Sequence, residues 1–196
     1  MSSAPALINA ENIAKDYGKG AVLAGVSLGI LRGERIGIVG RNGGGKSTLL
    51  RILVGAEQPD SGRVSFLSGL SIGYLAQIDE FPPDASISQV IFGDRDTHAW
   101  ASDSHAREVL EGLFGSHRAR DFDRAIAGLS GGERRRVSLA KLLVSNHDII
   151  CLDEPTNHLD VEGVNWLASY IKAERRIAVV VITHDRWFLD EVSDRT

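Results

Sequence analysis

The feature that most constrains the fold is a glycine-rich segment that lies between two apolar runs. Residues 40–47 contain four glycines and directly follow the apolar run at residues 36–39. Residues 48–54 are apolar again and are closed by Gly55, a residue type that commonly ends helices. A short apolar run that leads into a flexible turn and then a helix is typical of a buried parallel strand and its crossover helix. The segment therefore predicts an α/β fold.

Two further apolar runs, at residues 149–152 and 177–182, have the length and composition of buried strands. Each leads into polar residues, and ligands of open α/β sheets bind beyond the carboxyl ends of such strands. Residues 7–13 and the segments near Val26 and Val64 are expected to form weaker strands.

Helical spacing of apolar residues predicts two further helices. Asp160 is suited to cap the start of the second one, because a carboxylate there accepts hydrogen bonds from the first N–H groups. The apolar positions are Ala106, Val109, Leu110, Leu113 and Phe114 in the first helix, and Val161, Val164, Leu167, Ala168 and Ile171 in the second.

The middle of the chain, residues 86–144, has no clear buried strand and is predicted to be a mostly helical subdomain inserted into the α/β core. Residues 79–84, with Pro82 and Pro83, form the expected loop that leads into it. Residues 93–103 and 115–123 are expected to be exposed loops. Together, residues 1–196 are predicted to form a single domain.

Composition limits the environment and the partners. The 196 residues carry a formal net charge of −4, so no strong overall field favours nucleic acid or an anionic membrane. The single cysteine, Cys151, cannot form an internal disulfide, which fits a reducing compartment. No apolar run reaches the roughly 18 residues that a membrane helix needs. We therefore expect a cytoplasmic protein without membrane insertion and without a DNA partner, although it could dock on a membrane partner.

The glycine-rich segment matches G-x-x-x-x-G-K-[ST] at every fixed position, in the strand-to-helix context that this phosphate-binding motif requires. Glycines let successive backbone N–H groups point at phosphate oxygens, and the helix start adds a partial positive charge. Lys46 is expected to reach the β- and γ-phosphates, and the Ser47 hydroxyl to bind Mg²⁺. The competing interpretation is a glycine-rich turn that binds nothing. It is disfavoured because a loop with four glycines contributes little to packing.

The apolar run at residues 149–152 ends in two carboxylates, Asp153 and Glu154. In a P-loop ATPase the first holds Mg²⁺, usually through water, and the second polarises the attacking water. An ordinary solvated strand end is the alternative for two adjacent carboxylates, but the phosphate-binding motif favours the catalytic interpretation. Cys151 is interpreted as a small buried apolar residue.

Residues 129–133, Leu-Ser-Gly-Gly-Glu, precede another expected helix. Ser130 and Glu133 have the spacing of a capping box, so a well-capped helix start accounts for them locally. Two glycines in the first turn nevertheless lower the stability of a helix, and they would let backbone N–H groups approach an anion closely.

With this motif the chain resembles the ATP-binding cassette (ABC) superfamily, over nearly its whole length and with the motifs in the family's order. The resemblance implies an ABC ATPase core with a mostly parallel sheet, antiparallel N-terminal strands, ATP and Mg²⁺ as cofactors, and ATP hydrolysis. It implies catalytic roles for Glu154, His184 and Gln77. The implied Mg²⁺ ligands are Ser47, Gln77 and Asp153, and the implied nucleotide contacts are Tyr17, Gly40, Arg41, Asn42, Gly43, Gly44, Gly45, Lys46, Ser47, Thr48, Ser130, Gly131, Gly132 and Asp160.

The resemblance also implies individual roles and a partner. Tyr17 would stack on adenine, His184 would contact the γ-phosphate, and Asp160 would couple two sites. Taken alone, Tyr17, Gln77 and His184 are ordinary aromatic, polar and strand-end residues. Residues 130–133 match the family's signature loop. Family members form head-to-tail dimers in which each ATP lies between the phosphate loop of one cassette and the signature loop of the other. Ser130 would therefore contact the ATP of a second cassette.

Three details resemble the ABC-F branch, whose soluble members act on ribosomes. They are Ser-Gly-Gly-Glu-Arg at residues 130–134, where transporters usually carry Gln at the fourth position, Pro-Thr-Asn-His-Leu-Asp at 155–160, and His-Asp-Arg-Trp-Phe-Leu-Asp at 184–190. Members of this branch typically carry two cassettes joined by a long helical linker. The chain is thus expected to be the front part of a longer protein, without the C-terminal part of its cassette.

The leading functional hypothesis is an ATPase module of a ribosome-associated translation or antibiotic-resistance factor, in which ATP binding closes two cassettes and hydrolysis reopens them. One alternative is the nucleotide-binding subunit of a membrane transporter, which predicts a permease partner. Another is a truncated module that binds nucleotide without hydrolysing it.

Two groups of charged or polar residues are expected to have no special task. The basic run at residues 134–136 is predicted to be a solvated helix face, with contact to RNA phosphates as the alternative. His98, His105 and His117 lack the spacing of metal ligands and are expected to lie at the surface.

Overall fold

The computed structural model describes residues 5–18, 20–93, 103–115 and 122–196. The elements are, in chain order, β1 (Ile8–Asp16), β2 (Ala21–Ile30), β3 (Arg35–Ile38), α1 (Lys46–Leu53), β4 (Ser61–Phe66), β5 (Ile72–Leu75), α2 (Ile87–Phe92), α3 (Ser104–Phe114), the short 3₁₀ helix η2 (Ile126–Gly128), α4 (Gly131–Leu143), β6 (Ile149–Asp153), α5 (Val161–Ala173), β7 (Ala178–Ile182) and α6 (Arg186–Val192).

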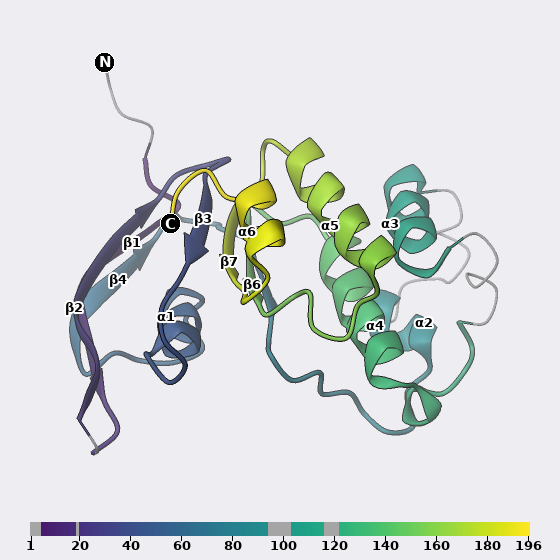
Figure 1. Cartoon of the computed structure of the whole chain (residues 1–196), viewed down its shortest axis with the longest axis horizontal. Coiled ribbons are helices and arrows are strands. Elements are labelled where there is room, and N and C mark those ends of the chain that lie inside the picture. Colours follow the sequence, from purple (N-terminus) through teal and green to yellow (C-terminus); the bar gives the residue numbers. More distant parts are fainter. Residues whose placement is uncertain (1–4, 19, 94–102, 116–121) are drawn as a thin grey trace.

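The strands form two sheets (Figure 1). An antiparallel sheet has the order β2-β1-β4, and a parallel sheet has the order β3-β7-β6-β5. Parallel neighbours need crossover connections, so helices separate these strands along the chain. The expected α/β architecture, with antiparallel N-terminal strands beside a parallel sheet, is confirmed. The runs predicted as buried strands correspond to β3, β6 and β7.

Neighbouring residues of β6 pack into two different cores, because side chains alternate between the faces of a sheet. Ile149 and Cys151 pack with α1 and the antiparallel sheet. Ile150 and Leu152 pack with α2, α3, α4, α5 and α6. Figure 1 shows α1 between the two sheets, and α3, α4 and α5 on the other side of the parallel sheet. Both faces of that sheet are covered, as its continuous apolar runs predicted.

The region predicted to be helical contains α2, α3 and α4. Its described residues contain no β-strand, and their only β-type pairing is an isolated bridge between Ser86 and Ala125. The loops predicted at residues 93–103 and 115–123 lie mostly outside the described residues. Phe122, at the end of the second, is buried and meets Phe114 edge to face at 5.6 Å. The prediction of an exposed loop is therefore wrong at this position, because its aromatic side chain joins the core.

β5 was not predicted from the sequence, since its four residues include a glycine and the partly buried Tyr74. The packing around the strand explains the glycine. A Cβ atom at Gly73 would lie 2.5 Å from the side chain of Leu142 and 2.6 Å from that of His147. The strand therefore needs glycine where the C-terminal part of α4 and the following loop cross it.

α5 begins as predicted, with one difference. The Asp160 carboxylate accepts a hydrogen bond of 2.9 Å from the backbone N–H of Gly163, so its predicted capping role is confirmed. Leu167 and Ile171 are buried as expected. Val161 was expected on the apolar face, but it is 76% exposed because this first helical residue lies beyond the core.

α3 and α5 approach each other at Gly112, where a Cβ atom would overlap the indole of Trp166. Alanine favours a helix over glycine by about 1 kcal/mol, so helix propensity alone predicts stabilisation by Gly112→Ala. We expect this change instead to lower the free energy of unfolding by about 1–3 kcal/mol, because the indole must move. Urea denaturation measures the effect. Glu111→Ala, at an exposed position beside it, is the control. A stabilised Gly112→Ala variant would contradict this helix contact.

Candidate functional site

The four parallel strands bring four distant segments to one edge of the sheet. β3 leads into the glycine-rich loop, β5 into Gln77, β6 into Asp153 and Glu154, and β7 into His184. Parallel strands end on the same side, and this side is where open α/β sheets bind ligands. The arrangement places the sequence-predicted residues of these segments around a common edge.

The glycine-rich loop turns the chain from β3 into α1. Gly43 and Gly45 have φ angles of 74° and 83°, a region that other L-residues rarely adopt. At Gly45, a Cβ atom would also lie 2.6 Å from the carbonyl oxygen of Val22. No side chain of the described residues caps the start of α1. Uncapped N–H groups at a helix start are donors suited to an anion.

Lys46 reaches back across this loop. Its Nζ donates hydrogen bonds to the carbonyl oxygens of Gly40 at 3.0 Å and Arg41 at 3.1 Å. An ammonium group bonds an anionic oxygen more strongly than a neutral one. Phosphate oxygens in the loop would therefore be preferred to these two carbonyls, and the lysine is already held at the loop.

Ser47, Gln77 and Asp153 line one cleft of about 1100 Å³. Asp153 is 2% exposed, and its Oδ1 atom has no hydrogen-bond partner among the described residues. An unpartnered buried carboxylate oxygen is unfavourable, and a hydrated cation would satisfy it. Mg²⁺ prefers oxygen ligands and is often held by one or two carboxylates together with phosphates. The three residues fit the set of Mg²⁺ ligands that the family resemblance implies.

Glu154 follows β6 with a φ angle of 50°, which is uncommon for a residue other than glycine. Its backbone N–H donates to the carbonyl of Ile182 at 2.8 Å, and its Oε2 accepts from the backbone N–H of His184 at 3.1 Å. The His184 Nε2 atom lies 3.3 Å from Glu154 Oε1, with the histidine side chain 60% exposed and that of the glutamate 8%. Backbone strain of this kind is common at functional sites. The structure thus brings these two residues into contact.

Tyr17, just after β1, is 52% exposed. Its hydroxyl is hydrogen-bonded to the Glu57 carboxylate, and Arg51 of α1 donates to that carboxylate at 2.9 Å. Arg51 also donates to the Thr48 hydroxyl at 3.3 Å, which links this cluster to the end of the phosphate loop. The hydroxyl is thus anchored while about half of the side chain stays accessible, as stacking on a base requires.

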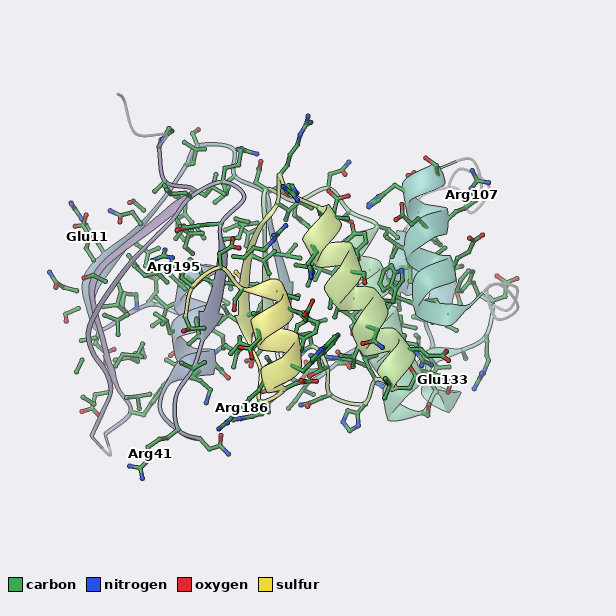
Figure 2. All side chains as sticks on the ribbon, turned by 45° about the horizontal axis from the view of Figure 1, so that its top comes forward. Glu11, Arg41, Arg107, Glu133, Arg186 and Arg195 are labelled. Carbon is green, nitrogen blue, oxygen red and sulfur yellow. The ribbon has the colours of Figure 1, made fainter. Side chains whose placement is uncertain are left out.

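The signature loop, at residues 130–133, forms the N-cap and the first turn of α4. The Ser130 hydroxyl accepts from the Glu133 N–H at 3.3 Å, and the Glu133 carboxylate accepts from the Ser130 N–H at 2.8 Å. The predicted capping box is confirmed. The bonds from Ser130, with help from Arg124, hold the pKa of the Glu133 carboxyl below its usual value. In Figure 2, Glu133 and Arg41 lie far apart along the molecule, so one chain does not bring its signature loop to its own phosphate loop.

The signature loop instead packs against the segment before α5. A Cβ atom at Gly132 would lie 2.7 Å from the carbonyl oxygen of His158, so this position requires glycine. Arg136 of α4 donates to Asp160 at 2.6 Å. This bond, together with the one from Gly163, lowers the pKa of the Asp160 carboxyl. Asp160 therefore connects the start of α5 to α4.

The prediction that residues 134–136 form a solvated helix face is wrong at Arg135, which is 1% exposed. Its guanidinium donates to carbonyl oxygens of Asp153 and Glu154 and to two further acceptors. Arg134 lies over the ring of Phe81, at 5.4 Å from the ring centroid. The neighbouring Arg136 is paired with Asp160. All three arginines of this run therefore contact other residues of the same chain.

A sequence signal for this burial exists. Arg135 precedes Leu139 by four residues and Leu142 by seven, which is the spacing of one helix face. Both leucines are buried. A charged residue in register with a buried apolar face indicates a buried, hydrogen-bonded group, and this periodicity outweighs the local appearance of a basic run.

The histidines that were expected at the surface divide into two cases. His98 and His117 lie outside the described residues. His105 is half-buried, and its Nε2 atom lies 2.9 Å from the Tyr170 hydroxyl. No cluster of three or more His, Cys, Asp or Glu side chains suited to a metal occurs in the described part of the chain.

A phosphate loop, an acidic strand end and a capped signature helix on this fold define a nucleotide-binding cassette. A family profile described as "ABC transporter" matches residues 23–157, which include all three features. The chain belongs to the ATP-binding cassette family, whose domains bind ATP, typically with Mg²⁺.

Individual relatives cover most of this chain but a minority of their own length. The energy-dependent translational throttle protein EttA of Mycobacterium tuberculosis is 33% identical over 94% of the chain and 39% of the relative. The tylosin resistance ATP-binding protein TlrC of Streptomyces fradiae is 35% identical over 95% of the chain and 41% of the relative. The chain thus spans about two fifths of the length of these relatives.

A solved structure shares the fold. The archaeal ribosome recycling factor aABCE1, solved in complex with a ribosomal stalk protein, matches with a TM-score of 0.82 and 30% identity over 99% of this chain and 37% of that chain. Within the described residues, the helices are too short or too polar to cross a bilayer.

Cys151 lies on β6 two residues before Asp153, and burial raises the pKa of its thiol to about 12. The thiolate is the reactive form, so at pH 8 only about one thiol in 10⁴ would be ionised. We expect iodoacetamide to modify the folded chain at least about 100-fold more slowly than the urea-unfolded chain, as followed by mass spectrometry. Similar rates in the two states would contradict the burial of β6.

Proposed function

We propose that this chain is one cassette domain of the ABC-F type, which binds and hydrolyses ATP with Mg²⁺ as part of a cytoplasmic, ribosome-associated translation or antibiotic-resistance factor. The observation that carries the ATPase proposal is the convergence at one sheet edge of the glycine-rich loop, the unpartnered Oδ1 of Asp153, and Glu154. These are the parts that phosphoryl transfer to water requires: a phosphate cradle, a metal ligand and a base.

Each residue has a task in the proposed reaction. Lys46 exchanges its two carbonyl partners for oxygens of the β- and γ-phosphates. Ser47, Gln77 and Asp153 would hold Mg²⁺, which would neutralise charge on the phosphates. Glu154 orients the attacking water and accepts its proton. His184, held against Glu154, donates to the γ-phosphate.

A second cassette completes the proposed site, either in a longer protein or on another chain. The signature loop lies away from the phosphate loop of its own chain, which supports this arrangement (Figure 2). In a head-to-tail pair, residues 130–132 would contact the ATP held by the other cassette. The backbone N–H groups at the start of α4 suit that role, because helix starts bind anions.

The proposed ribosomal role draws on the relatives and on the motifs. EttA is named a translational throttle protein, TlrC a tylosin resistance protein, and aABCE1 a ribosome recycling factor. The sequences at residues 130–134, 155–160 and 184–190 agree with the ABC-F branch. A transporter subunit would share the fold, so the capture of a membrane permease is the outcome that favours this alternative.

Lys46→Ala tests the phosphate site. The variant loses charged hydrogen bonds worth about 1.5–3 kcal/mol, so we expect its affinity for Mg·ATP to fall about 10- to 100-fold. Isothermal titration calorimetry on the folded chain measures the affinity. Lys172→Ala, on the surface of α5, should bind as the unchanged chain does. Equal affinities for all three proteins would contradict nucleotide binding at this loop.

Glu154→Gln tests hydrolysis and the partner. Loss of the base should reduce the hydrolysis rate by about 100-fold or more, while Mg·ATP binding persists. With the second cassette present, in a longer protein or on another chain, the variant should then co-sediment with ribosomes when ATP is present. Glu162→Gln, at an exposed position in the first turn of α5, is the matched control. A variant that stays off ribosomes and binds a permease would refute the ribosomal role.

A further inference from the structure

Arg135 of α4 is a charged residue among the largest fully buried side chains of the described chain. A guanidinium stays protonated in proteins, and a buried charge is tolerated only when it is paired and hydrogen-bonded. Its charged partner is Asp79, whose Oδ1 lies 2.9 Å from Nη1. The remaining acceptors are neutral, so their identity shows what else this side chain holds in place.

The first branch of the guanidinium holds the segment that contains Gln77. Nη1 donates to the carbonyl oxygen of Ala76 at 2.7 Å and to the Asp79 carboxylate. These two acceptors flank Gln77, which lines the cleft together with Ser47 and Asp153, the other expected Mg²⁺ ligands. The branch therefore holds the backbone directly before this residue and the side chain of Asp79 after it.

The second branch holds the backbone around Glu154. Nη2 donates to the carbonyl oxygens of Asp153 at 2.7 Å and Glu154 at 2.8 Å. The N–H of Glu154 bonds to Ile182, and the following residue, Pro155, has no N–H. Every hydrogen-bonding group of the two peptide units that flank Glu154 is thus satisfied. Arg135 bonds both carbonyl groups, and the Glu154 carbonyl also accepts from the N–H of Asn157 at 3.2 Å. A left-handed φ at a non-glycine residue persists only where neighbours impose it in this way.

We propose that Arg135 is a positioning residue for ATP hydrolysis, which fixes Glu154 and the Gln77 segment relative to each other and to α4. The inference rests on the proposed function for its catalytic part. Because α4 begins at the signature loop, a shift of this helix caused by the nucleotide of a second cassette reaches Glu154 of the same chain through one side chain.

Pairing the charge with Asp79 uses one branch of the guanidinium. The other branch is buried as well, so its N–H groups also need acceptors, and the acceptors that it bonds are the carbonyl groups of the acidic pair. These bonds hold the backbone that carries the Glu154 side chain. Lysine at position 135 keeps the charge but has a single nitrogen, which cannot bond both segments. Arg135→Lys therefore separates positioning from charge.

Hydrogen exchange tests the positioning without any nucleotide. In Arg135→Lys, amides in residues 76–79 and 153–158 should exchange about 10-fold faster or more, while amides in residues 138–143 of α4 keep their rates. A role in helix stability alone would accelerate exchange along the whole of α4 and would overturn the proposal. Arg107→Lys, an exposed site on α3 that Figure 2 places far from Arg41, is the control.

Kinetics tests the catalytic part with the proposed second cassette present, in a longer protein or on another chain. Arg135→Lys should lower kcat for ATP hydrolysis by about 10- to 100-fold and leave the Kd for Mg·ATP within about 3-fold, because misplacing a base slows the reaction more than binding. A folded variant with unchanged kcat overturns the inference alone. Absence of ATP hydrolysis by the unchanged protein would refute the proposed function instead, while the exchange result still decides whether Arg135 holds both segments.

A second variant covers the case in which Arg135→Lys does not fold. Asp79→Asn keeps the shape of the acceptor but removes the charge that holds the first branch. It should lower kcat by about 3-fold or more at unchanged Kd, and should accelerate exchange in residues 76–79 and 153–158 together. Acceleration confined to residues 76–79, with kcat unchanged, would overturn the proposal.

Discussion

The site depends on the burial of β6 on both of its faces. All five residues of this strand are buried. Its apolar side chains alternate between the core around α1 and the core formed with α2, α3, α4, α5 and α6. Buried backbone groups must pair, and β5 and β7 supply the partners on either side. Asp153 and Glu154 therefore leave the sheet from its most enclosed strand, and functional groups on rigid elements keep their geometry better than groups on loops.

Three charged groups are buried together at this strand end. Arg135 bonds the backbone carbonyls of Asp153 and Glu154 rather than their carboxylates. The positive charge is thus close, while the Oδ1 of Asp153 has no hydrogen-bond partner in the part of the chain that the structure describes. Such an oxygen lowers the stability of the free chain, and a ligand that satisfies it stabilises the folded state. The arrangement favours binding at the expense of stability, as is common at functional sites.

Much of the fold could be predicted because its signals are local. The apolar runs located β3, β6 and β7, and the serine–glutamate spacing located the start of α4. β5 escaped prediction because Gly73 reflects the close approach of α4, which the strand's own residues do not reveal. The helical spacing of Arg135 indicates its burial, but its acceptors could not be predicted, because they lie 59 residues before it at Ala76 and 18 and 19 residues after it at Asp153 and Glu154.

The sequence by itself determined the parts: which runs must be buried, where helices begin, and where only glycine suits the backbone. These properties depend on side-chain chemistry and on neighbours a few residues away. The tertiary structure alone decided that four strand ends meet at one edge, that the signature loop lies away from the phosphate loop, and that one guanidinium joins two segments of the site. Strand order and side-chain burial depend on which distant surfaces cover one another, because apolar area and polar groups are satisfied by the whole fold.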